Sequence, residues 1–502
     1  MEGIFEIFCG LTVIILLLYY YLTMTFDYWK VRDVKGPQPI PLFGNMKDVI
    51  FHKINMTEYL MNIYNSYKDE RYIGIFFRSR PILILRDPQL IKNILIRDFS
   101  SFPQRAVDVT EKVEPLTQNL IYLEAHRWRP LRNKLTPAFS IIKMKEMFPL
   151  IMTSSLHFEE YINKIPDNDI IDIYKLFNKF TINIIGNCVF GIEIDVIKDE
   201  ENEFSKIIKE IFKDNLMTLV KYRLQMNFPK LYNELGFLFR NSRHISFFSN
   251  IVNKTIKYRT ENNIVRNDFI NVLMELKRNP EKLSEDIELT DTFYAAQAYV
   301  FFAAGSETSS LTMTFILYEL AQNQNIQDKV RKEINDEYEK NDGTLKFESI
   351  KTLKYLQAVF KETLRKHPPV IFLSRECMIP SYTLEDTKIT IGKHQRIFIP
   401  VIALHKDPNI YPNPNVFDPT RFITENNLIN DGTYLPFGRG PRNCIGEKFA
   451  EYQVIIGLAT FLRNHKVDIC EKTKIPYTIG RSDFLLQPKE EIYLKISKVI
   501  EK

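Results

Sequence analysis

A lone cysteine, Cys444, stands in the stretch FGRGPRNCIG, which runs from Phe437 to Gly446. A thiolate is a nucleophile and a ligand for metal ions, and the N-terminus of a helix favours its negative charge. An apolar helical pattern, EKFAEYQVIIGLATFL, starts just after this thiol. Gly440 and Gly446 let the backbone approach closely, and Arg442 can meet an anion beside whatever the sulfur binds. A cysteine before a helix is by itself more often a small core residue, so the surrounding motifs must decide.

A second group of chemically active residues is AAGSETSS, in which Glu307 and Thr308 are adjacent. It interrupts the apolar run AYVFFAAG within a helix predicted from about Asp291 to Gln322, with Thr290 as its cap. Gly305 costs about 1 kcal/mol relative to alanine in mid-helix, and the hydroxyl groups can bond to the backbone and loosen the turn. An acid beside a hydroxyl can deliver protons. The alternative is a helix–helix contact made by small residues.

Glu362 and Arg365 in KYLQAVFKETLRKHPP are three residues apart, so they share one face of a predicted helix. Pairs of this kind are usually solvated and contribute little stability. Here apolar residues surround the pair, and FDPTRF offers it a further partner, Arg421. Their spacing alone leaves open whether they form a surface ion pair or part of a larger site.

Phe437, Gly440, Arg442, Cys444 and Gly446 together form the pattern F-x-x-G-x-R-x-C-x-G. The pattern closely resembles the haem-binding signature of the cytochrome P450 family, whose cysteine thiolate is the axial ligand of haem iron and favours O–O cleavage. The resemblance implies that Cys444 binds the iron of haem b (iron protoporphyrin IX). It also implies that Arg442 pairs with a haem propionate and that Phe437 packs against the proximal face of the ring.

Other stretches match the same family in the same order along the chain. Trp128 and Arg132 form W-x-x-x-R, and the resemblance implies that they and Arg375 in PPVIFLSREC contact the haem propionates. The sequence A-G-x-E-T resembles the family's oxygen-activation groove. By this resemblance Thr308 would hydrogen-bond the oxygen bound there, and Glu307 would help to relay protons from solvent.

The resemblance also assigns structural and substrate-binding roles. Glu362, Arg365 and Arg421 would form a buried triad that holds the scaffold of the haem loop. The family commonly has an acid where Thr420 stands here, a departure that leaves the arginine itself unaffected. The candidate pocket residues are apolar, so an apolar substrate is expected; they are Phe301, Ala304, Val370, Ile371, Leu373 and Leu485.

The N-terminal stretch from Ile7 to Phe26 contains no charged residue and is just long enough, as a helix, to span a bilayer core. Basic residues between positions 30 and 35 follow it, so the positive-inside rule places the rest of the chain in the cytosol. Tyr28 and Trp29 lie where interfacial aromatic residues would. The alternative is a cleaved secretory signal, but the stretch lacks a basic n-region. We therefore expect an uncleaved membrane anchor.

Composition and periodicity indicate an ordinary globular protein of 502 residues with a net charge of +5 and five scattered cysteines. The charge gives no reason to expect nucleic-acid binding, and the cysteines indicate neither disulfides nor a zinc cluster. Most of the chain has helical periodicity, with strand patterns at Tyr72 to Pro88, at Arg396 to Pro408 and, as a hairpin, in DFLLQPKEEIYLKI. We expect a mainly α fold with small β-sheets, which the resemblance identifies with the cytochrome P450 fold.

Three regions are expected along the chain. They are an N-terminal membrane anchor (1–27), a basic and proline-rich hinge (28–45) and a single haem-binding catalytic domain (46–502). The prolines of the hinge favour an extended, semi-rigid backbone. KLTPAFSIIKMKEMFPLI and NIIGNCVFGIE resemble the insect microsomal detoxification-type group, which implies a single-pass protein of the endoplasmic reticulum membrane with a cytosolic catalytic domain.

The resemblance implies a haem-thiolate monooxygenase, which inserts one atom of O₂ into a lipophilic xenobiotic or endogenous lipid-like compound and reduces the other to water. Electrons would come from NADPH through a separate NADPH–cytochrome P450 reductase, with cytochrome b5 as a second candidate donor. The chain has no G-x-G-x-x-G motif of its own for the dinucleotide. The basic residues Arg127, Arg129, Lys134 and Lys448 form either a docking patch for the reductase or a solvated face.

Two alternatives differ in chemistry. An isomerase or dehydratase of the same fold would rearrange a peroxide without O₂ or reductase. The adjacent Glu307 and Thr308 argue against it, because that chemistry needs no proton relay. A haem-containing binding protein would do no chemistry, and it predicts that Thr308→Ala leaves function unchanged.

Overall fold

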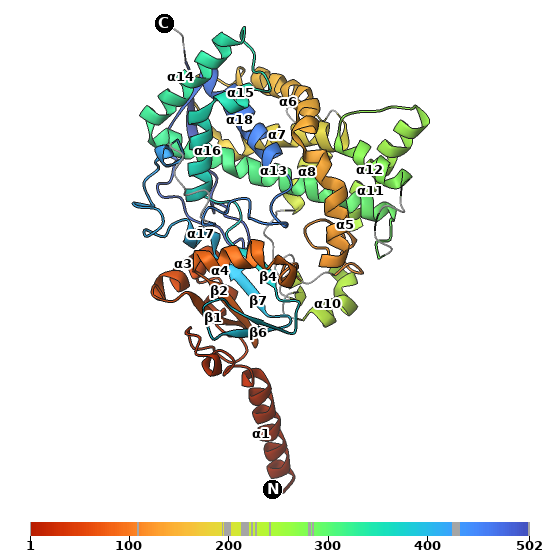
Figure 1. The fold of residues 1–502 in the computed structure, drawn as a ribbon, viewed down its shortest axis with the longest axis vertical. Helices are drawn as coiled ribbons and strands as arrows, with labels where there is room; N and C mark the ends of the chain where they lie inside the picture. Colours follow the sequence, from red (N-terminus) through yellow and green to blue (C-terminus); the bar gives the residue numbers. More distant parts are fainter. Residues whose placement is uncertain are drawn as a thin grey trace.

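The computed structural model describes residues 2–107, 110–192, 194, 202–211, 220–221, 224–225, 228–239, 242–279, 283, 286–423 and 432–499. Most helices gather in one broad body, and a four-stranded sheet lies at the end of the body from which the N-terminal helix projects (Figure 1). The predicted mainly α fold with small β-sheets is confirmed.

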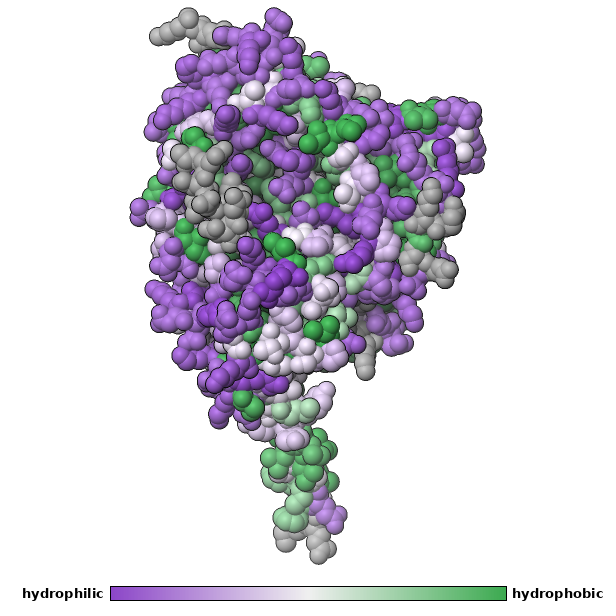
Figure 2. Space-filling model, in the orientation of Figure 1, coloured by the Kyte–Doolittle hydropathy of each residue, from purple (hydrophilic) through white to green (hydrophobic). Residues whose placement is uncertain are grey.

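The helix α1 (Glu2–Thr23) projects from the body with a largely apolar surface (Figures 1 and 2). Its segment Gly3–Thr23 has a mean hydropathy of 2.1, and none of it is buried. A helix of this length and composition fits a membrane anchor. Among the described residues one other helix is long and apolar enough to cross a membrane, α13 (Asp291–Gln322), but it is 72% buried and belongs to the core.

The segment that follows α1 is bound to the body. Trp29 is 3% exposed, and its indole Nε1 donates a hydrogen bond to the carbonyl of Ile75 (2.9 Å). The carbonyl of Lys35 accepts a hydrogen bond from the N–H of Gly74 (2.9 Å), and a Cβ on Gly36 would lie 1.8 Å from the Gly74 oxygen. The predicted place of Trp29 in an interfacial aromatic belt is therefore wrong, because the protein interior buries its ring and satisfies its N–H.

The four-stranded sheet contains the predicted pair around Arg78, whose φ is +55° at the tight turn. This pair is antiparallel, β7 lies parallel to β2, and β4 lies antiparallel to β7. The strand predicted from Arg396 ends early, because Pro400 breaks the ladder and precedes a short helix. The order is β1–β2–β7–β4, with β1 (Tyr72–Phe77), β2 (Arg80–Leu85), β4 (Leu373–Glu376) and β7 (Arg396–Ile399).

Two smaller antiparallel sheets have the orders β3–β9–β8 and β5–β6, with β3 (Asp169–Asp172), β5 (Ser381–Thr383), β6 (Thr390–Gly392), β8 (His465–Asp468) and β9 (Tyr493–Lys498). The predicted C-terminal hairpin is wrong, because its two halves pair with other parts of the chain. β9 lies between β3 and β8, whereas Leu485 forms a bridge with Val370 and Leu486 donates its N–H to the carbonyl of Pro369 (2.8 Å).

The long helix α13 is the centre of the body. Thr290 caps it as predicted, by accepting a hydrogen bond from the N–H of Phe293 (3.1 Å). Every side chain from Ser309 to Ala321 is buried, because neighbouring helices cover the helix on all sides. These neighbours are α7 (Ile173–Ile185), α11 (Ser242–Glu261), α16 (Lys354–Lys366) and α18 (Glu447–Asn464).

The remaining helices cover this centre or connect it to the sheets. They are α2 (Lys47–Ile50), α3 (Met56–Ser66), α4 (Pro88–Lys92), α5 (Ala125–Leu135), α6 (Ile141–Ile162), α8 (Glu203–Ile211), α10 (Pro229–Leu235), α12 (Phe269–Arg278), α14 (Gln324–Lys340), α15 (Ser349–Thr352) and α17 (Val401–Leu404). Shorter helical turns are η1 (Lys30–Arg32), η2 (Asn93–Arg97), η3 (Phe99–Ser101), η4 (Pro115–Thr117), η5 (Thr136–Phe139), η6 (Gly186–Phe190), η7 (Gly236–Phe239) and η9 (Pro419–Phe422).

Candidate functional site

One large internal cavity, of about 860 Å³, brings together most of the predicted site residues. A cavity of this size accommodates a small-molecule ligand or cofactor. Gly440, Ile371 and the Glu362–Arg365–Arg421 triad lie outside its lining. The predicted residues that line it are Phe437, Arg442, Cys444, Gly446, Trp128, Arg132, Arg375, Glu307, Thr308, Phe301, Ala304, Val370, Leu373 and Leu485.

The thiol loop, residues 437–446, turns tightly because two of its glycines adopt a left-handed backbone. Gly438 has a φ of +68° and Gly440 a φ of +75°, a region that residues with a Cβ rarely adopt. A Cβ on Gly440 would lie 1.9 Å from the carbonyl oxygen of Leu95. The N–H of Cys444 donates to the carbonyl of Phe437 (2.8 Å) and closes the loop. Gly440 thus allows the close backbone approach predicted for it, and that approach is to the carbonyl of Leu95.

The Cys444 side chain has exposed surface although it lies deep inside the protein, since that surface faces the cavity. The residue lies just before Gly446, the N-cap of α18, as predicted. Burial raises the pKa of the Cys444 thiol, and the hydrogen bond from the Gly446 N–H lowers it only in part. Burial thus opposes ionisation of the sulfur, whereas a metal ion bound to it would favour the thiolate.

Two arginines at the cavity are buried with unpartnered nitrogen atoms. Arg442 is 3% exposed; its Nε donates to the carbonyl of Pro103 (2.7 Å) and Nη2 to that of Leu123 (3.0 Å), while Nη1 has no partner. Arg375 is 2% exposed; Nη1 donates to the carbonyl of Ser374 (2.8 Å), while Nε has no partner. Burial, together with neighbouring arginines, lowers the pKa of Arg442 to about 8 and that of Arg375 to about 9. Such a site is complete only with an anion.

Two further arginines border the same space. Arg132 donates to both the carbonyl and the Oδ1 of Asn443, each over 2.9 Å. Arg105 donates to the carbonyl of Arg442 (3.4 Å), and burial lowers its pKa. Sequence analysis missed Arg105, because it stands in an irregular loop without a motif. The guanidinium carbon of Arg442 lies 4.2 Å from the ring centroid of Trp128, a cation–π contact that orients it.

These residues fit a haem group. The described residues offer no ion pair to any member of the arginine group (Arg105, Arg132, Arg375 and Arg442), and the two carboxylates of haem would supply the missing charge. Cys444 presents a sulfur ligand to the same cavity. A Cβ on Gly446 would meet no atom within 4 Å, so a flat ring has room beside that backbone.

Glu307 and Thr308 both line the cavity from α13, but their side chains are held differently. Glu307 is 1% exposed; its Oε2 accepts a hydrogen bond from the hydroxyl of Tyr174 (2.5 Å) and its Oε1 from Nε2 of Gln487 (2.7 Å). Burial raises the pKa of Glu307, and the two hydrogen bonds lower it in part. Thr308 Oγ1 donates to the carbonyl of Ala304 (2.7 Å), so its oxygen can still accept a hydrogen bond. Sequence analysis did not find Tyr174 and Gln487.

The helix α13 is unbroken through the predicted weak point, so the expected loosening is wrong. The hydroxyl groups bond to carbonyls one turn back, as Ser306 does to Phe302 (2.7 Å), and the backbone ladder persists beside these bonds. A Cβ on Gly305 would lie 2.6 Å from Cδ1 of Ile185 in α7. Gly305 therefore serves a close helix–helix contact, the alternative that the sequence had left open, and it also lines the cavity.

The apolar wall of the cavity is largely aromatic. The ring of Phe301 lies 5.1 Å from that of Phe139 and 4.3 Å from that of Phe269, measured between centroids. The rings of Phe372 and Phe484 are 5.9 Å apart. All five line the cavity, and two of them, Phe139 and Phe269, come from segments that the sequence had not assigned to the pocket.

One predicted pocket residue, Ile371, does not line the cavity. It is fully buried in the main core, whereas Val370 and Phe372 face the cavity on either side of it in sequence. Neighbouring side chains of an extended backbone point in opposite directions, and this alternation turns Ile371 away.

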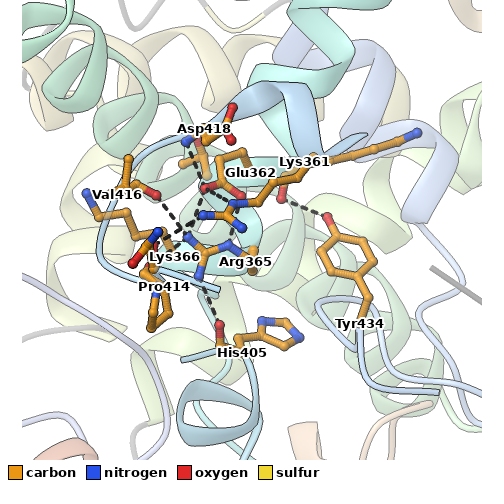
Figure 3. A network of polar contacts seen from close by, with 12 residues as sticks. Lys361, Glu362, Arg365, Lys366, His405, Pro414, Val416, Asp418 and Tyr434 are labelled. Atoms are coloured by element: carbon orange, nitrogen blue, oxygen red, sulfur yellow. Dashed lines mark hydrogen bonds and ion pairs between the residues drawn. The ribbon is translucent and has the colours of Figure 1, made fainter. Parts of the chain in front are cut away.

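The predicted triad forms a buried ion network (Figure 3). Glu362 and Arg365 are both fully buried and make two contacts, Nε to Oε2 over 2.7 Å and Nη2 to Oε1 over 2.8 Å. Arg421 Nε lies 3.6 Å from Glu362 Oε1, longer than a hydrogen bond. Thr420 donates from Oγ1 to Asp418 (2.5 Å), whose N–H in turn donates to Glu362 (3.0 Å). Asp418 therefore joins the network through its backbone N–H, while its carboxylate binds Thr420.

Comparisons with known proteins extend this description beyond the site. A sequence model of the cytochrome P450 family matches residues 34–496. The chain is similar to Cytochrome P450 6a2 of Drosophila melanogaster, with 37% identity over 494 residues that cover 96% of this chain and 97% of that protein. It is also similar to Cytochrome P450 6A1 of Musca domestica, at 34% identity over 98% of both chains, and to Cytochrome P450 6B2 of Helicoverpa armigera, at 34% over 97% of both.

Proposed function

Because the chain belongs to the cytochrome P450 family, we propose that it is a membrane-anchored haem-thiolate monooxygenase acting on lipophilic small molecules. It inserts one atom of O₂ into the substrate and reduces the other to water, with electrons from NADPH. The observation that carries this proposal is the convergence of Cys444, the arginine group, and the Glu307–Thr308 pair on one cavity.

Haem b is the cofactor that these residues would hold. Cys444 would supply the sulfur ligand of its iron, and Phe437, in the same loop, would pack against the ring. The arginine group and Trp128 would bind the propionates, whose charges would satisfy the unpartnered nitrogen atoms of Arg375 and Arg442. When bound, haem supplies a redox-active iron, and the thiolate ligand favours cleavage of the O–O bond.

Glu307 and Thr308 are the residues that handle protons. Burial raises the pKa of Glu307, which brings its proton affinity closer to that needed for a group exchanging protons near neutral pH. Thr308, the next residue along α13, also lines the cavity, and its hydroxyl oxygen can accept a hydrogen bond from a proton donor or a water molecule. This pair favours O₂ activation over the rearrangement of a peroxide, which requires no delivered proton.

The substrate is an apolar compound, either a xenobiotic to be detoxified or an endogenous lipid-like molecule. The aromatic rings of Phe301, Phe372 and Phe484 line the cavity, and such rings bind apolar surface, especially other rings, by edge and face contacts. Val370, Leu373 and Leu485 add aliphatic surface. Oxidation would make such a substrate more polar.

The electron donor is NADPH–cytochrome P450 reductase, with cytochrome b5 as a second candidate. Of the predicted basic patch, Arg129 and Lys448 are exposed and Lys134 is half-buried. Arg127 forms ion pairs with Glu111 and Glu124, and Lys448 forms one with Glu451. Exposed charge at Arg129 attracts an acidic donor more strongly than the paired residues do.

The protein resides in the endoplasmic reticulum membrane through α1, with its catalytic part in the cytosol. The anchor (1–27) is followed by the hinge (28–45) and a single catalytic domain (46–502). Because the hinge packs on the sheet through Trp29 and Gly36, the anchor and the catalytic domain are firmly joined.

The decisive experiment is the absorption spectrum of the dithionite-reduced carbonyl complex of the full-length protein. Thiolate ligation gives a red-shifted Soret band, which Cys444→Ser should abolish. Cys470→Ser is the matched control, because Cys470 contacts Thr473 and does not line the cavity. An unaltered band in Cys444→Ser would contradict the proposal. Product formation from an apolar substrate panel should require NADPH and reductase, whereas product from a peroxide substrate alone would favour the isomerase.

A further inference from the structure

Both oxygens of the Glu307 carboxylate are occupied by donors from outside the cavity. Oε2 accepts from the Tyr174 hydroxyl over 2.5 Å and Oε1 from the Gln487 amide over 2.7 Å. Glu307 lines the cavity, whereas Tyr174 and Gln487 do not. Two hydrogen-bond donors that do not line the cavity therefore hold the carboxylate.

The backbone at or beside each donor is held by a hydrogen bond to another segment of the chain. Tyr174 lies in the first turn of α7, where the neighbouring Ile173 N–H donates to the carbonyl of Ile492 (3.0 Å). The carbonyl of Gln487 accepts from the N–H of Gly480 (2.7 Å). The two side chains thus reach Glu307 from two segments other than α13. Contacts outside α13 therefore hold the carboxylate in place.

Neither donor is a source of protons at neutral pH. Burial, the Glu307 carboxylate and the nearby Asp172 raise the pKa of Tyr174 well above its usual value, and an amide does not ionise. Asp172 itself is paired with Lys175 (3.0 Å). Burial raises the pKa of Glu307, and the two hydrogen bonds lower it. What the two donors supply is thus stabilisation of a negative charge that burial opposes.

We propose that Tyr174 and Gln487 are positioning residues, which stabilise the charged form of Glu307 and fix the position of its carboxylate at the cavity. The inference rests on the proposed monooxygenase function, in which Glu307 takes up a proton from solvent and passes it toward the cavity. Each carboxylate oxygen has two lone-pair sites, so a proton can bind while both hydrogen bonds persist. Once it has left, the two donors stabilise the carboxylate again.

The first test titrates Glu307 directly, by infrared difference spectroscopy of the full-length protein over a pH series. The carbonyl band of the protonated carboxyl group is assigned by its loss in Glu307→Gln. In Tyr174→Phe and in Gln487→Met the band should appear at a higher pH than in the unsubstituted protein, because each variant removes one bond to the charged form. Tyr318→Phe is the matched control, because Tyr318 lies on α13, as Glu307 does, but its hydroxyl donates to the carbonyl of Lys474 (3.0 Å). An unchanged titration in both variants would overturn the proposal.

The second test measures how much product forms per NADPH consumed, with 7-ethoxycoumarin as the probe and reductase present. Tyr174→Phe and Gln487→Met should lower this ratio by roughly tenfold, as expected when a catalytic group is slightly misplaced, while the probe's binding spectrum stays the same. An unchanged ratio in both variants would contradict a positioning role. If the unsubstituted protein gives no NADPH-dependent product with any apolar substrate, the proposed function fails, while the titration still reports on Tyr174 and Gln487.

Discussion

The buried imidazole of His405 accepts a hydrogen bond at Nε2 from the backbone N–H of Leu435, over 2.9 Å. The carbonyl of His405 accepts another from Nη1 of Arg365 (2.9 Å), and the carbonyl of Leu435 accepts one from the N–H of Gly438 in the thiol loop (3.1 Å). One histidine therefore connects the ion network of Figure 3 to the loop that carries Cys444.

Replacing this histidine should loosen the thiol loop. His405→Phe keeps a buried ring but leaves the N–H of Leu435 without its acceptor, which costs about 1–3 kcal/mol of unfolding free energy. Denaturant unfolding of the detergent-solubilised protein, followed by circular dichroism, measures this loss, and haem content should fall with it. His394→Ala is the control, because the side chain of His394 is 64% exposed. If His394→Ala lost as much unfolding free energy as His405→Phe, the buried hydrogen bond of His405 would be unimportant.

Removing one partner of the Glu362–Arg365 pair should be severe. Arg365→Met leaves the carboxylate of Glu362 buried without its main partner, an effect of about 3–5 kcal/mol. The variant Glu362→Leu/Arg365→Met removes both charges and should lose less than the sum of the two single variants. The comparison uses the unfolding free energies of Arg365→Met, Glu362→Leu and the double variant. Additive losses would show that the two side chains act independently.

The glycines of the thiol loop should respond differently to an added methyl group. Gly440 has a φ of +75°, and Gly440→Ala would place a Cβ 1.9 Å from the carbonyl oxygen of Leu95. Because the backbone cannot move aside easily, we expect a loss of at least about 1–3 kcal/mol of unfolding free energy. Gly446→Ala meets no atom within 4 Å and should leave unfolding in the absence of haem unchanged. It should nevertheless shift the Soret band or weaken haem retention, because the methyl group would enter the space of the cofactor. Equal stability of the two variants would refute this distinction.

Stability should fall as the pH decreases from about 6.5 toward 4. Burial lowers the pKa of His405 to about 3 and that of His367 to about 4, from the ordinary 6.5. Between these values the unfolded chain binds protons that the folded chain does not, so acid favours unfolding, by up to about 1.4 kcal/mol per pH unit for each histidine. Denaturant midpoints over this pH range measure the slope. His405→Phe should flatten it; an equal slope in His405→Phe and the unsubstituted protein would contradict the assignment.

Local patterns were sufficient for the elements and for the reactive residues. The thiol loop, the cap of α13 at Thr290 and the long uncharged stretch of α1 each depend on residues that are neighbours in sequence. The glycines, the helix cap and the periodicity act over a few residues. The same is true of the pair formed by Glu362 and Arg365, which share one turn of helix.

Contacts between residues far apart in the chain could not be predicted from local patterns. The C-terminal hairpin was wrong because β9 pairs with strands from far along the chain, and Ile371 was wrong because the local backbone turns it toward the core. Arg105 and His405 belong to no sequence motif. Tertiary packing buries them, and this burial is what makes their hydrogen bonds important. Pairing and burial of this kind are properties of the whole fold.

The sequence by itself determined which groups could do chemistry: one thiol at the start of a helix, an acid beside a hydroxyl, and arginines in motifs. The tertiary structure alone decided how those groups are held. Tyr174 lies 133 residues from Glu307 and Gln487 lies 180 residues from it, and nothing local to any of the three specifies their contact. Hydrogen bonds act over a few ångströms, whereas sequence patterns describe only residues adjacent in the chain, so the partners of a buried charge appear only when distant segments pack together.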